Sequence, residues 1–179
     1  MLPFCIAMLS FVFFLLWTRP SFGLAGLERS TIPAQPKVTL SEGTEISGLV
    51  EPKYSSVRQF LGIPYAQPPV GDLRWEAPRS TRLPKSVRAT TYGTSCTQFF
   101  ASAANVFNRD VLEFNIGNIN TTGEDCLNLS VWTPQNAKNL PVVIFFYGGG
   151  WYTGGQDVPY QIPTQWVQRT MDLIVVVPK

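Results

Sequence analysis

Phe145-Phe146-Tyr147-Gly148-Gly149-Gly150-Trp151-Tyr152-Thr153-Gly154-Gly155 is the stretch of this sequence that decides the fold. It begins inside an apolar run, residues 142–146, which predicts a buried strand, and five glycines then fall within eight residues. Glycines in tandem let the main chain adopt positive φ and let a ligand approach bare N–H groups. The stretch therefore predicts a strand that ends in a binding loop built from backbone, and the alternative is a tight turn at the strand end.

The ligand expected for this loop is an anion. The loop lacks the Gly-Lys-Ser/Thr ending of a phosphate-binding P-loop and the glycine spacing of a dinucleotide-binding loop. The remaining specific interpretation is an oxyanion hole, in which N–H groups face the oxygen that becomes negative when a carbonyl is attacked. Residues 147–150, Tyr-Gly-Gly-Gly, have the form of the His-Gly-Gly-Gly loop of lipases and esterases, with Tyr in place of His.

Composition excludes several classes of function. The chain of 179 residues is 45% hydrophobic and 13% aromatic, which is enough for a sizeable core and predicts a globular protein. Its 14 Lys and Arg and 12 Asp and Glu give a net charge of +2 with no charged block, so no nucleic-acid partner is expected. Histidine, the usual general base and metal ligand, is absent, and we expect neither a metal nor a cofactor.

The amino-terminal residues resemble a secretory signal. Residues 2–17 are apolar apart from Ser10, and small residues follow between 21 and 26. We expect a signal peptide over residues 1–25, cleaved near Gly23 or Ala25, and a secreted protein. An uncleaved anchor is the alternative, but the run is shorter than the ~20 apolar residues of a spanning helix, so no stable membrane anchor is expected.

The segments before the glycine loop predict strands and one long connection. Residues 34–63 alternate short β-prone pieces with breakers and predict a small antiparallel sheet of hairpins. Residues 62–75 are too rich in proline for a helix or a central strand, yet they carry large apolar side chains and predict an ordered loop pressed onto the core. Residues 126–132 alternate apolar and polar side chains and predict a half-buried strand.

Two cysteines flank a surface loop. Cys96 and Cys126 enclose 29 residues, and the sequon Asn120-Thr121-Thr122 lies between them. In a secreted chain they predict a disulfide-closed loop with a glycan at Asn120, and two free cysteines are the alternative. Asn128 also begins a sequon, but its place in a strand offers little access to a glycosyltransferase.

Residues 141–146 and 173–177 are continuous apolar runs separated by the glycine loop and a weakly helical stretch, residues 163–170. Runs of this kind are typical of parallel strands covered on both faces. The glycine loop is then expected at the carboxyl end of the first strand, where open α/β sheets bind ligands. The sequence stops at Lys179, directly after a predicted core strand, where a domain does not normally end.

Three separated regions carry a resemblance to a known family, namely residues 60–66 with 68–75, residues 123–134 (Gly-Glu-Asp-Cys-Leu-Asn-Leu-Ser-Val-Trp-Thr-Pro) and residues 147–150. They resemble the amino-terminal third of type-B carboxylesterases and lipases, a family that includes the cholinesterases and has the α/β-hydrolase fold. The resemblance implies an α/β fold over residues 26–179, in which a small antiparallel hairpin sheet leads into a mostly parallel central sheet that is incomplete in this chain.

The resemblance also implies roles for particular residues. Gly149 and Gly150 would supply two oxyanion N–H groups, and the two cysteines match the first disulfide of the family. Arg74 and Glu124 match a buried ion pair that pins the proline-rich loop to the start of a strand. Two separately solvated charges are the alternative to that pair.

The catalytic residues of the family are missing. Members carry a Gly-x-Ser-x-Gly nucleophile elbow followed by an acid and a histidine, and this sequence has neither the elbow nor a histidine. We therefore expect an inactive amino-terminal fragment of a secreted carboxylic ester hydrolase, whose full-length form would act on a small-molecule or lipid ester through a serine acyl-enzyme. A non-catalytic cholinesterase-like binding or adhesion protein and a secreted module of unrelated function are the alternatives.

Overall fold

The structure of the chain is a computed structural model that describes residues 35–101, 103, 105–116 and 122–179. All of these belong to one of the two units into which the chain divides, residues 33–179. The expected signal peptide and Asn120 lie outside the described residues. Within the described ranges, no helix is both long enough and apolar enough to cross a membrane.

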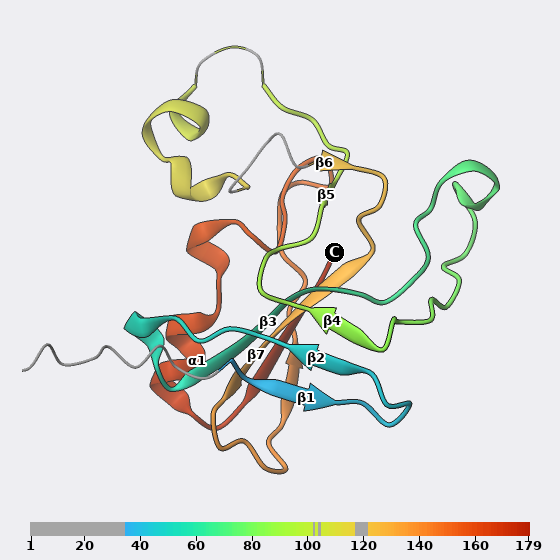
Figure 1. Cartoon of the computed structure of the whole chain (residues 1–179). Helices are drawn as coiled ribbons and strands as arrows, with labels where there is room; N and C mark the ends of the chain where they lie inside the picture. The colour runs from blue at the N-terminus through green and yellow to red at the C-terminus, as the bar shows by residue number, and fades with distance from the viewer. Residues whose placement is uncertain (1–34, 102, 104, 117–121) are drawn as a thin grey trace, which may run out of the picture. The chain divides into compact units, whose positions relative to one another are not determined.

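A four-stranded mixed sheet forms the centre of this unit, with the strand order β3-β7-β9-β8 (Figure 1). Its members are β3 (Val57–Pro64), β7 (Asn128–Pro134), β8 (Val142–Ile144) and β9 (Ile174–Pro178). β7 is antiparallel to both β3 and β9, whereas β8 and β9 are parallel. The prediction that the two β-branched runs form parallel strands is confirmed, although the described part of the sheet is mixed and not mostly parallel.

Two smaller sheets lie outside the central one. Their strands are β1 (Lys37–Thr39), β2 (Glu45–Ser47), β4 (Ser86–Arg88), β5 (Ser95–Cys96) and β6 (Thr122–Gly123). β1 and β2 form the expected antiparallel hairpin, but the next strand of their sheet is β4, which runs parallel to β2. The hairpin prediction is therefore wrong for residues 57–63, which belong to the central sheet. β5 and β6 pair in parallel.

The helices are short and lie in the connections. They are the 3-10 helices η1 (Pro52–Tyr54), η2 (Gly71–Leu73), η4 (Leu112–Phe114) and η6 (Pro159–Gln161), the π-helical turn η3 (Val106–Asp110) and the α-helix α1 (Thr164–Thr170). α1 covers the predicted helical stretch apart from Pro163, and the left-handed φ of 56° at Met171, the residue after the helix, ends it. It packs against β3 and β7 and buries Val167 in the core.

The main core lies between α1 and the central sheet. Its fully or almost fully buried members are Val57, Leu61, Trp132, Val167, Val175 and Val177. The indole N–H of Trp132 donates to Oε1 of Gln59 at 3.2 Å, and Nε2 of Gln59 donates to Glu51 at 2.7 Å. Because a buried polar group without a partner is costly, these two bonds allow Gln59 to be 99% buried in an apolar core.

The side chains on the two faces of β7 are not buried in the expected pattern. An alternating strand is expected to bury its apolar side, but Leu129 and Val131 are half-buried, whereas Asn128 and Ser130 are buried together with Trp132. The two sides of β7 face different cores, since Trp132 belongs to the main core and Val131 packs against a smaller cluster of Ile46, Phe60 and Ala89. Ser130 lies opposite a bulge in β3, where the register shifts between Phe60 and Ile63. The bulge leaves the N–H of Gly62 without a strand partner, and Oγ of Ser130 accepts it at 3.0 Å.

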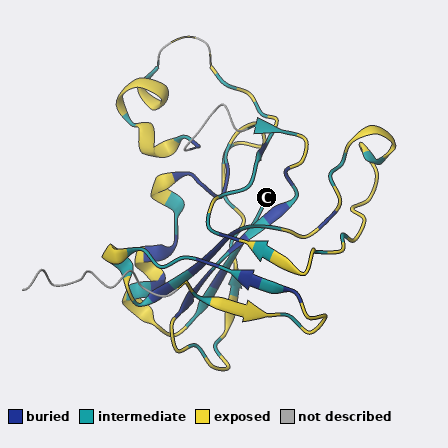
Figure 2. Cartoon of the chain, viewed as in Figure 1, coloured by how far each residue is buried: buried dark blue, intermediate teal, exposed yellow. Residues whose placement is uncertain are grey.

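Two segments that were expected to be buried are exposed. Val142 and Ile144 of β8 are 57% and 59% exposed, so this edge strand is not covered on both faces in the described unit. The proline-rich loop is not pressed onto the core either, since Val70 is 44% and Trp75 is 95% exposed (Figure 2). It folds back on itself instead, because the N–H of Gln67 donates to the carbonyl of Arg79 at 2.8 Å.

Candidate functional site

The glycine loop, defined as residues 147–155, leaves the carboxyl end of β8 as the sequence predicts. The N–H of Phe145 donates to Val176 at 2.8 Å, so the chain is still paired with β9 just before the loop begins. Phe145 and Tyr147 pack against the main core, whereas Gly148 and Gly150 are exposed. The loop therefore starts from a fixed strand end and presents its first glycines to solvent.

Close backbone packing explains why the loop needs glycine. Gly149 has φ 152° and Gly150 has φ 63°, which side chains rarely allow. A Cβ built on Gly149 would lie 1.7 Å from the carbonyl oxygen of Thr153, and one on Gly154 would lie 2.5 Å from that of Gly148. The two ends of the loop thus touch backbone to backbone, and no side chain fits between them.

The N–H groups of Gly149 and Gly150 have no acceptor within the part of the chain that the structure describes. The carbonyl of Gly149, in contrast, accepts the N–H of Thr153 at 3.2 Å. Unpaired main-chain N–H groups in a glycine-rich loop can bind an anionic oxygen. The structure thus leaves both predicted donors available, and their role toward an oxyanion stays a prediction.

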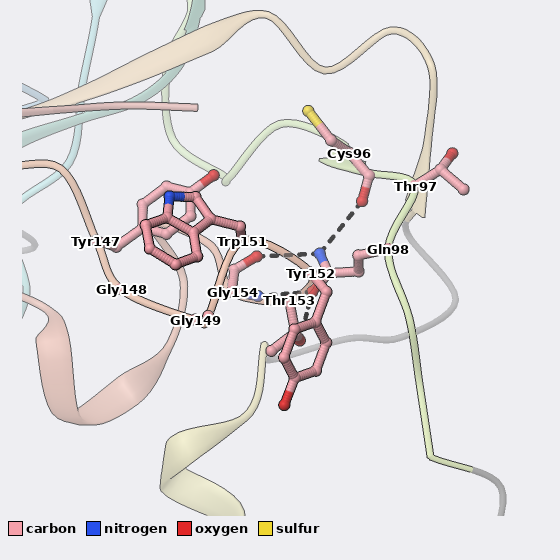
Figure 3. Close-up of a pocket in the computed structure, with 11 residues that line it drawn as sticks. Cys96, Thr97, Gln98, Tyr147, Gly148, Gly149, Trp151, Tyr152, Thr153 and Gly154 are labelled. Carbon is pink, nitrogen blue, oxygen red and sulfur yellow. Dashed lines mark hydrogen bonds between the residues drawn. The ribbon is translucent and has the colours of Figure 1, made fainter.

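A cavity of about 570 Å³ opens beside the glycine loop and is lined by residues 96–98 and 147–154 (Figure 3). A second cavity of about 740 Å³ shares part of this lining and extends over the loop closed by the disulfide. None of the described residues that line either cavity carries a charge. Among the described residues, no group of three or more His, Cys, Asp or Glu side chains could hold a metal.

Aromatic rings form much of the wall of the larger cavity. Phe114 stacks on Tyr160 with ring centres 4.3 Å apart, and Phe107 meets Phe114 edge to face at 6.2 Å. Phe99 and Tyr152 form another edge-to-face pair at 6.0 Å. All five rings are between 44% and 62% exposed, so the cavity offers an apolar and uncharged surface next to the free N–H groups.

The predicted disulfide between Cys96 and Cys126 is present, with Cα atoms 5.0 Å apart. It ties β5 to the start of β7. Two residues after Cys96, the side chain of Gln98 reaches the glycine loop and bonds to Thr153 and Gly154 (Figure 3). Gln98 was not predicted from the sequence, because its partners in the glycine loop lie more than 50 residues away and two of those three atoms belong to the main chain.

Arg74 and Glu124 form an ion pair with a closest N–O distance of 2.6 Å, but the expectation that the pair is buried is wrong. The two side chains are 51% and 44% exposed. The proline-rich loop that carries Arg74 stands away from the core, so both charges stay in contact with water. An exposed pair of this kind contributes little to stability.

A buried charged cluster that the sequence analysis also missed lies behind the glycine loop. Nζ of Lys179 donates to Oγ of Ser95 at 2.7 Å and to the carbonyl of Gly93 at 3.0 Å, and it lies 3.6 Å from Oδ1 of Asp157. Burial lowers the pKa of Lys179, and the carboxylate of Asp157 opposes this shift. Because Asp157 lies two residues after the glycine loop and Ser95 belongs to β5, the cluster fixes the far end of the loop to β5.

Burial also raises the pKa of Tyr147, the residue that stands in the place of the esterase histidine, and the negative charge of Asp157 adds to this effect. Its phenol therefore stays protonated well above neutral pH. Tyr147 in this state can donate a hydrogen bond but cannot serve as a general base at neutral pH.

Comparison with known proteins identifies the family. The profile of the carboxylesterase family matches residues 34–179. Chlorogenic acid esterase from Aspergillus niger is 37% identical over 138 residues, which are 74% of this chain and 27% of that protein. Secreted lipase 5 from Gibberella zeae is 33% identical over 165 residues, covering 82% of this chain and 31% of the lipase. Cholinesterase from Mus musculus is 38% identical over 153 residues, or 82% of this chain and 24% of the cholinesterase.

The chain belongs to the carboxylesterase family. The family resemblance that the sequence motifs carry is thus confirmed, and the mixed sheets with few helices agree with a part of the α/β-hydrolase fold. The chain spans between 24% and 31% of the length of these three relatives.

Proposed function

We propose that this chain is the amino-terminal part of a carboxylic ester hydrolase and supplies two donors of its oxyanion hole. The observation that carries the proposal is the pair of free N–H groups at Gly149 and Gly150, in a cavity at the carboxyl end of a strand. Attack on an ester carbonyl places negative charge on its oxygen, and fixed N–H donors stabilise that charge in the transition state.

The nucleophile, acid and base of this reaction would come from residues outside this sequence. A serine nucleophile in a Gly-x-Ser-x-Gly turn and a histidine base form the usual machinery of α/β-hydrolases, and this sequence contains neither. The 179 residues contain neither a serine in such a turn nor a histidine that could activate a hydroxyl for attack on an ester. We propose that this chain by itself does not hydrolyse esters.

The substrate class follows from the cavity lining. The relatives are named as an esterase of chlorogenic acid, a lipase and a cholinesterase, so their names support an ester without selecting one. A cavity wall with several aromatic rings and, among the described residues, no charged side chain favours an ester whose larger group is apolar and uncharged. We propose such a small-molecule or lipid ester as the substrate of the full-length protein.

Secretion is part of the proposal. The disulfide fits an oxidising compartment, and one relative is named a secreted lipase. Amino-terminal sequencing of material collected from a secreting host should then begin just after Gly23 or Ala25. A glycan at Asn120 should be removed by an endoglycosidase and should be missing from an Asn120→Gln variant.

The decisive test compares this chain with a longer protein that continues it through a Gly-x-Ser-x-Gly turn and a histidine. The longer protein should hydrolyse a short activated ester such as p-nitrophenyl acetate, and an organophosphate should block the turnover. This chain should show none. Hydrolysis by the chain itself, sensitive to the organophosphate, would refute the division of roles, and a longer protein that binds esters without turnover would favour a non-catalytic binding protein.

A further inference from the structure

We infer that Gln98 is a positioning residue, which holds the glycine loop in the conformation that presents the N–H groups of Gly149 and Gly150. The inference deepens the proposed function and rests on it for its effect on catalysis. The mechanical part, that Gln98 fixes the loop, concerns this chain alone and can be tested without any activity.

The side-chain amide of Gln98 uses its full hydrogen-bonding capacity (Figure 3). Its Oε1 accepts the N–H of Gly154 at 2.8 Å and the hydroxyl of Thr153 at 2.9 Å. Its Nε2 donates to the carbonyl of Gly154 at 3.0 Å and to that of Cys96 at 3.2 Å. An amide has two donor hydrogens and two acceptor lone pairs, so every one is matched in this geometry.

These bonds fix Gln98 in one orientation. Gly154 offers it both a donor and an acceptor, so an amide turned by 180° would place like groups against each other. A side chain without hydrogen-bonding groups cannot replace these contacts, and a carboxylate would face two carbonyl oxygens. The arrangement therefore requires glutamine at this position.

The contacts continue from Gly154 to the predicted donors. The N–H of Thr153 donates to the carbonyl of Gly149, and the carbonyl of Thr153 occupies the space where a Cβ of Gly149 would lie. The backbone of Gly154 packs in the same close way against the carbonyl of Gly148. Because the two segments pack backbone against backbone, residues 153–154 cannot shift without moving residues 148–149.

The segment that carries Gln98, residues 96–99, is itself held in place by other contacts. Cys96 is fixed by the disulfide, and the N–H of Phe99 donates to the carbonyl of Tyr152 at 3.0 Å. The edge-to-face rings of Phe99 and Tyr152 lie beside this bond. Residues 96–99 thus form a support next to residues 152–154, and Gln98 is the side chain that hydrogen-bonds Thr153 and Gly154 to it.

The first experiment measures amide hydrogen exchange by NMR in this chain and in Gln98→Met, which keeps the length of the side chain and removes its hydrogen bonds. We expect the N–H of Gly154 to exchange roughly tenfold faster or more, since it loses its acceptor and the loop opens more often. The N–H of Phe145, bonded to Val176 in the sheet, should keep its protection and report that the fold is intact.

Matched variants separate the role of Gln98 from general effects. Gln165→Met removes an exposed glutamine whose Nε2 donates to Tyr54, and it should leave exchange in the glycine loop unchanged. Thr153→Val removes one of the four bonds at an exposed position and should give a smaller acceleration at Gly154. Exchange at Gly154 that is the same in Gln98→Met and in the wild type would overturn the inference.

The second experiment uses a longer, active protein that contains this segment. If the loop presents transition-state donors, Gln98→Met should lower kcat by about 10- to 100-fold with little change in KM. Faster exchange with an unchanged kcat per folded molecule would overturn the catalytic half of the inference. A wild-type protein without turnover would instead refute the proposed function, while the exchange result would still decide whether Gln98 holds the loop.

Discussion

Nζ of Lys179 lies 3.6 Å from Oδ1 of Asp157, and their side chains are 0% and 8% exposed. Two opposite charges are therefore enclosed behind the glycine loop, with Ser95 and the carbonyl of Gly93 completing the partners of the ammonium group. Burial favours the neutral form of a lysine, and here it outweighs the attraction of the carboxylate, so the pKa of Lys179 is lowered.

Stability should consequently rise with pH on the alkaline side of neutrality. In the window between the lowered pKa of Lys179 in the folded chain and its ordinary value, the unfolded chain binds the proton that the folded chain has lost. Because the unfolded state then binds more protons, the free energy of unfolding increases as pH rises through this window. Above pH ~10 the raised pKa of the buried Tyr92 acts in the opposite direction, since tyrosine in the unfolded chain ionises there.

Denaturant unfolding of the wild type and of Lys179→Met between pH 7 and pH 10 measures this contribution. The difference in free energy of unfolding, wild type minus variant, should become more favourable to the wild type as pH increases. A difference that stays flat or falls over this range would contradict the lowered pKa of Lys179.

Breaking the disulfide should weaken both the fold and the glycine loop. Replacing both Cys96 and Cys126 by Ser removes a cross-link that closes a sequence separation of 30 residues, and it should cost roughly 3–4 kcal/mol by the chain-entropy estimate. Thermal unfolding of the double variant checks the stability. Exchange at Gly154 should also accelerate, because the support of Gln98 is released, and unchanged exchange would mean that the loop does not depend on the cross-link.

Arg74→Ala should have a small effect. The Arg74–Glu124 pair is about half exposed, so its loss should cost at most about 1 kcal/mol and less in high salt. Arg79→Ala is the matched control, because Arg79 is an exposed arginine five residues further along and forms no ion pair among the described residues. A loss of 3 kcal/mol or more, estimated as typical of a broken buried pair, would show that the pair is enclosed in the full-length protein.

Gly149→Ala should disrupt the glycine loop, because its Cβ would lie 1.7 Å from the carbonyl oxygen of Thr153. In an active, longer protein kcat per folded molecule should fall by about 10²- to 10³-fold, with little change in KM. Gly148→Ala is the structural control, since its Cβ meets nothing within 4 Å and the loop should keep its exchange pattern. If Gly149→Ala lowers stability but leaves kcat per folded molecule intact, the loop is only a tight turn.

The sequence predicted those parts of the fold that depend on local pattern. The β-branched runs form β8 and β9, and the glycines follow β8 at its carboxyl end, because short apolar runs and tandem glycines have few other uses. The pair Cys96 and Cys126 predicted the disulfide without the family resemblance, because two cysteines in a secreted chain usually pair. The choice of Gly149 and Gly150 as oxyanion donors came from the family resemblance.

The features that could not be predicted from the sequence depend mainly on hydrogen bonds between residues far apart in the chain. The hydroxyl of Ser130, which is buried on the side of Trp132, accepts the N–H of Gly62 at a bulge in β3, and no periodicity in β7 signals that bulge. Gln98 makes two of its four hydrogen bonds to main-chain atoms of Gly154 in a distant loop, and main-chain atoms give no residue type by which to recognise a partner. The proline-rich loop has apolar side chains but satisfies its backbone by folding on itself, so its composition predicted burial that the structure lacks.

Trp151 gives the glycine loop an intrinsic fluorescence reporter. Its side chain follows Gly150 directly and is fully exposed, whereas Trp132 in the core is fully buried. A water-soluble collisional quencher such as iodide should therefore reach Trp151 and not Trp132. Trp75→Phe and Trp166→Phe together remove the other exposed indoles of the described residues. In that background, a compound that enters the cavity beside residues 147–154 should shield Trp151 and shift its emission, so that fluorescence reports occupancy of the cavity.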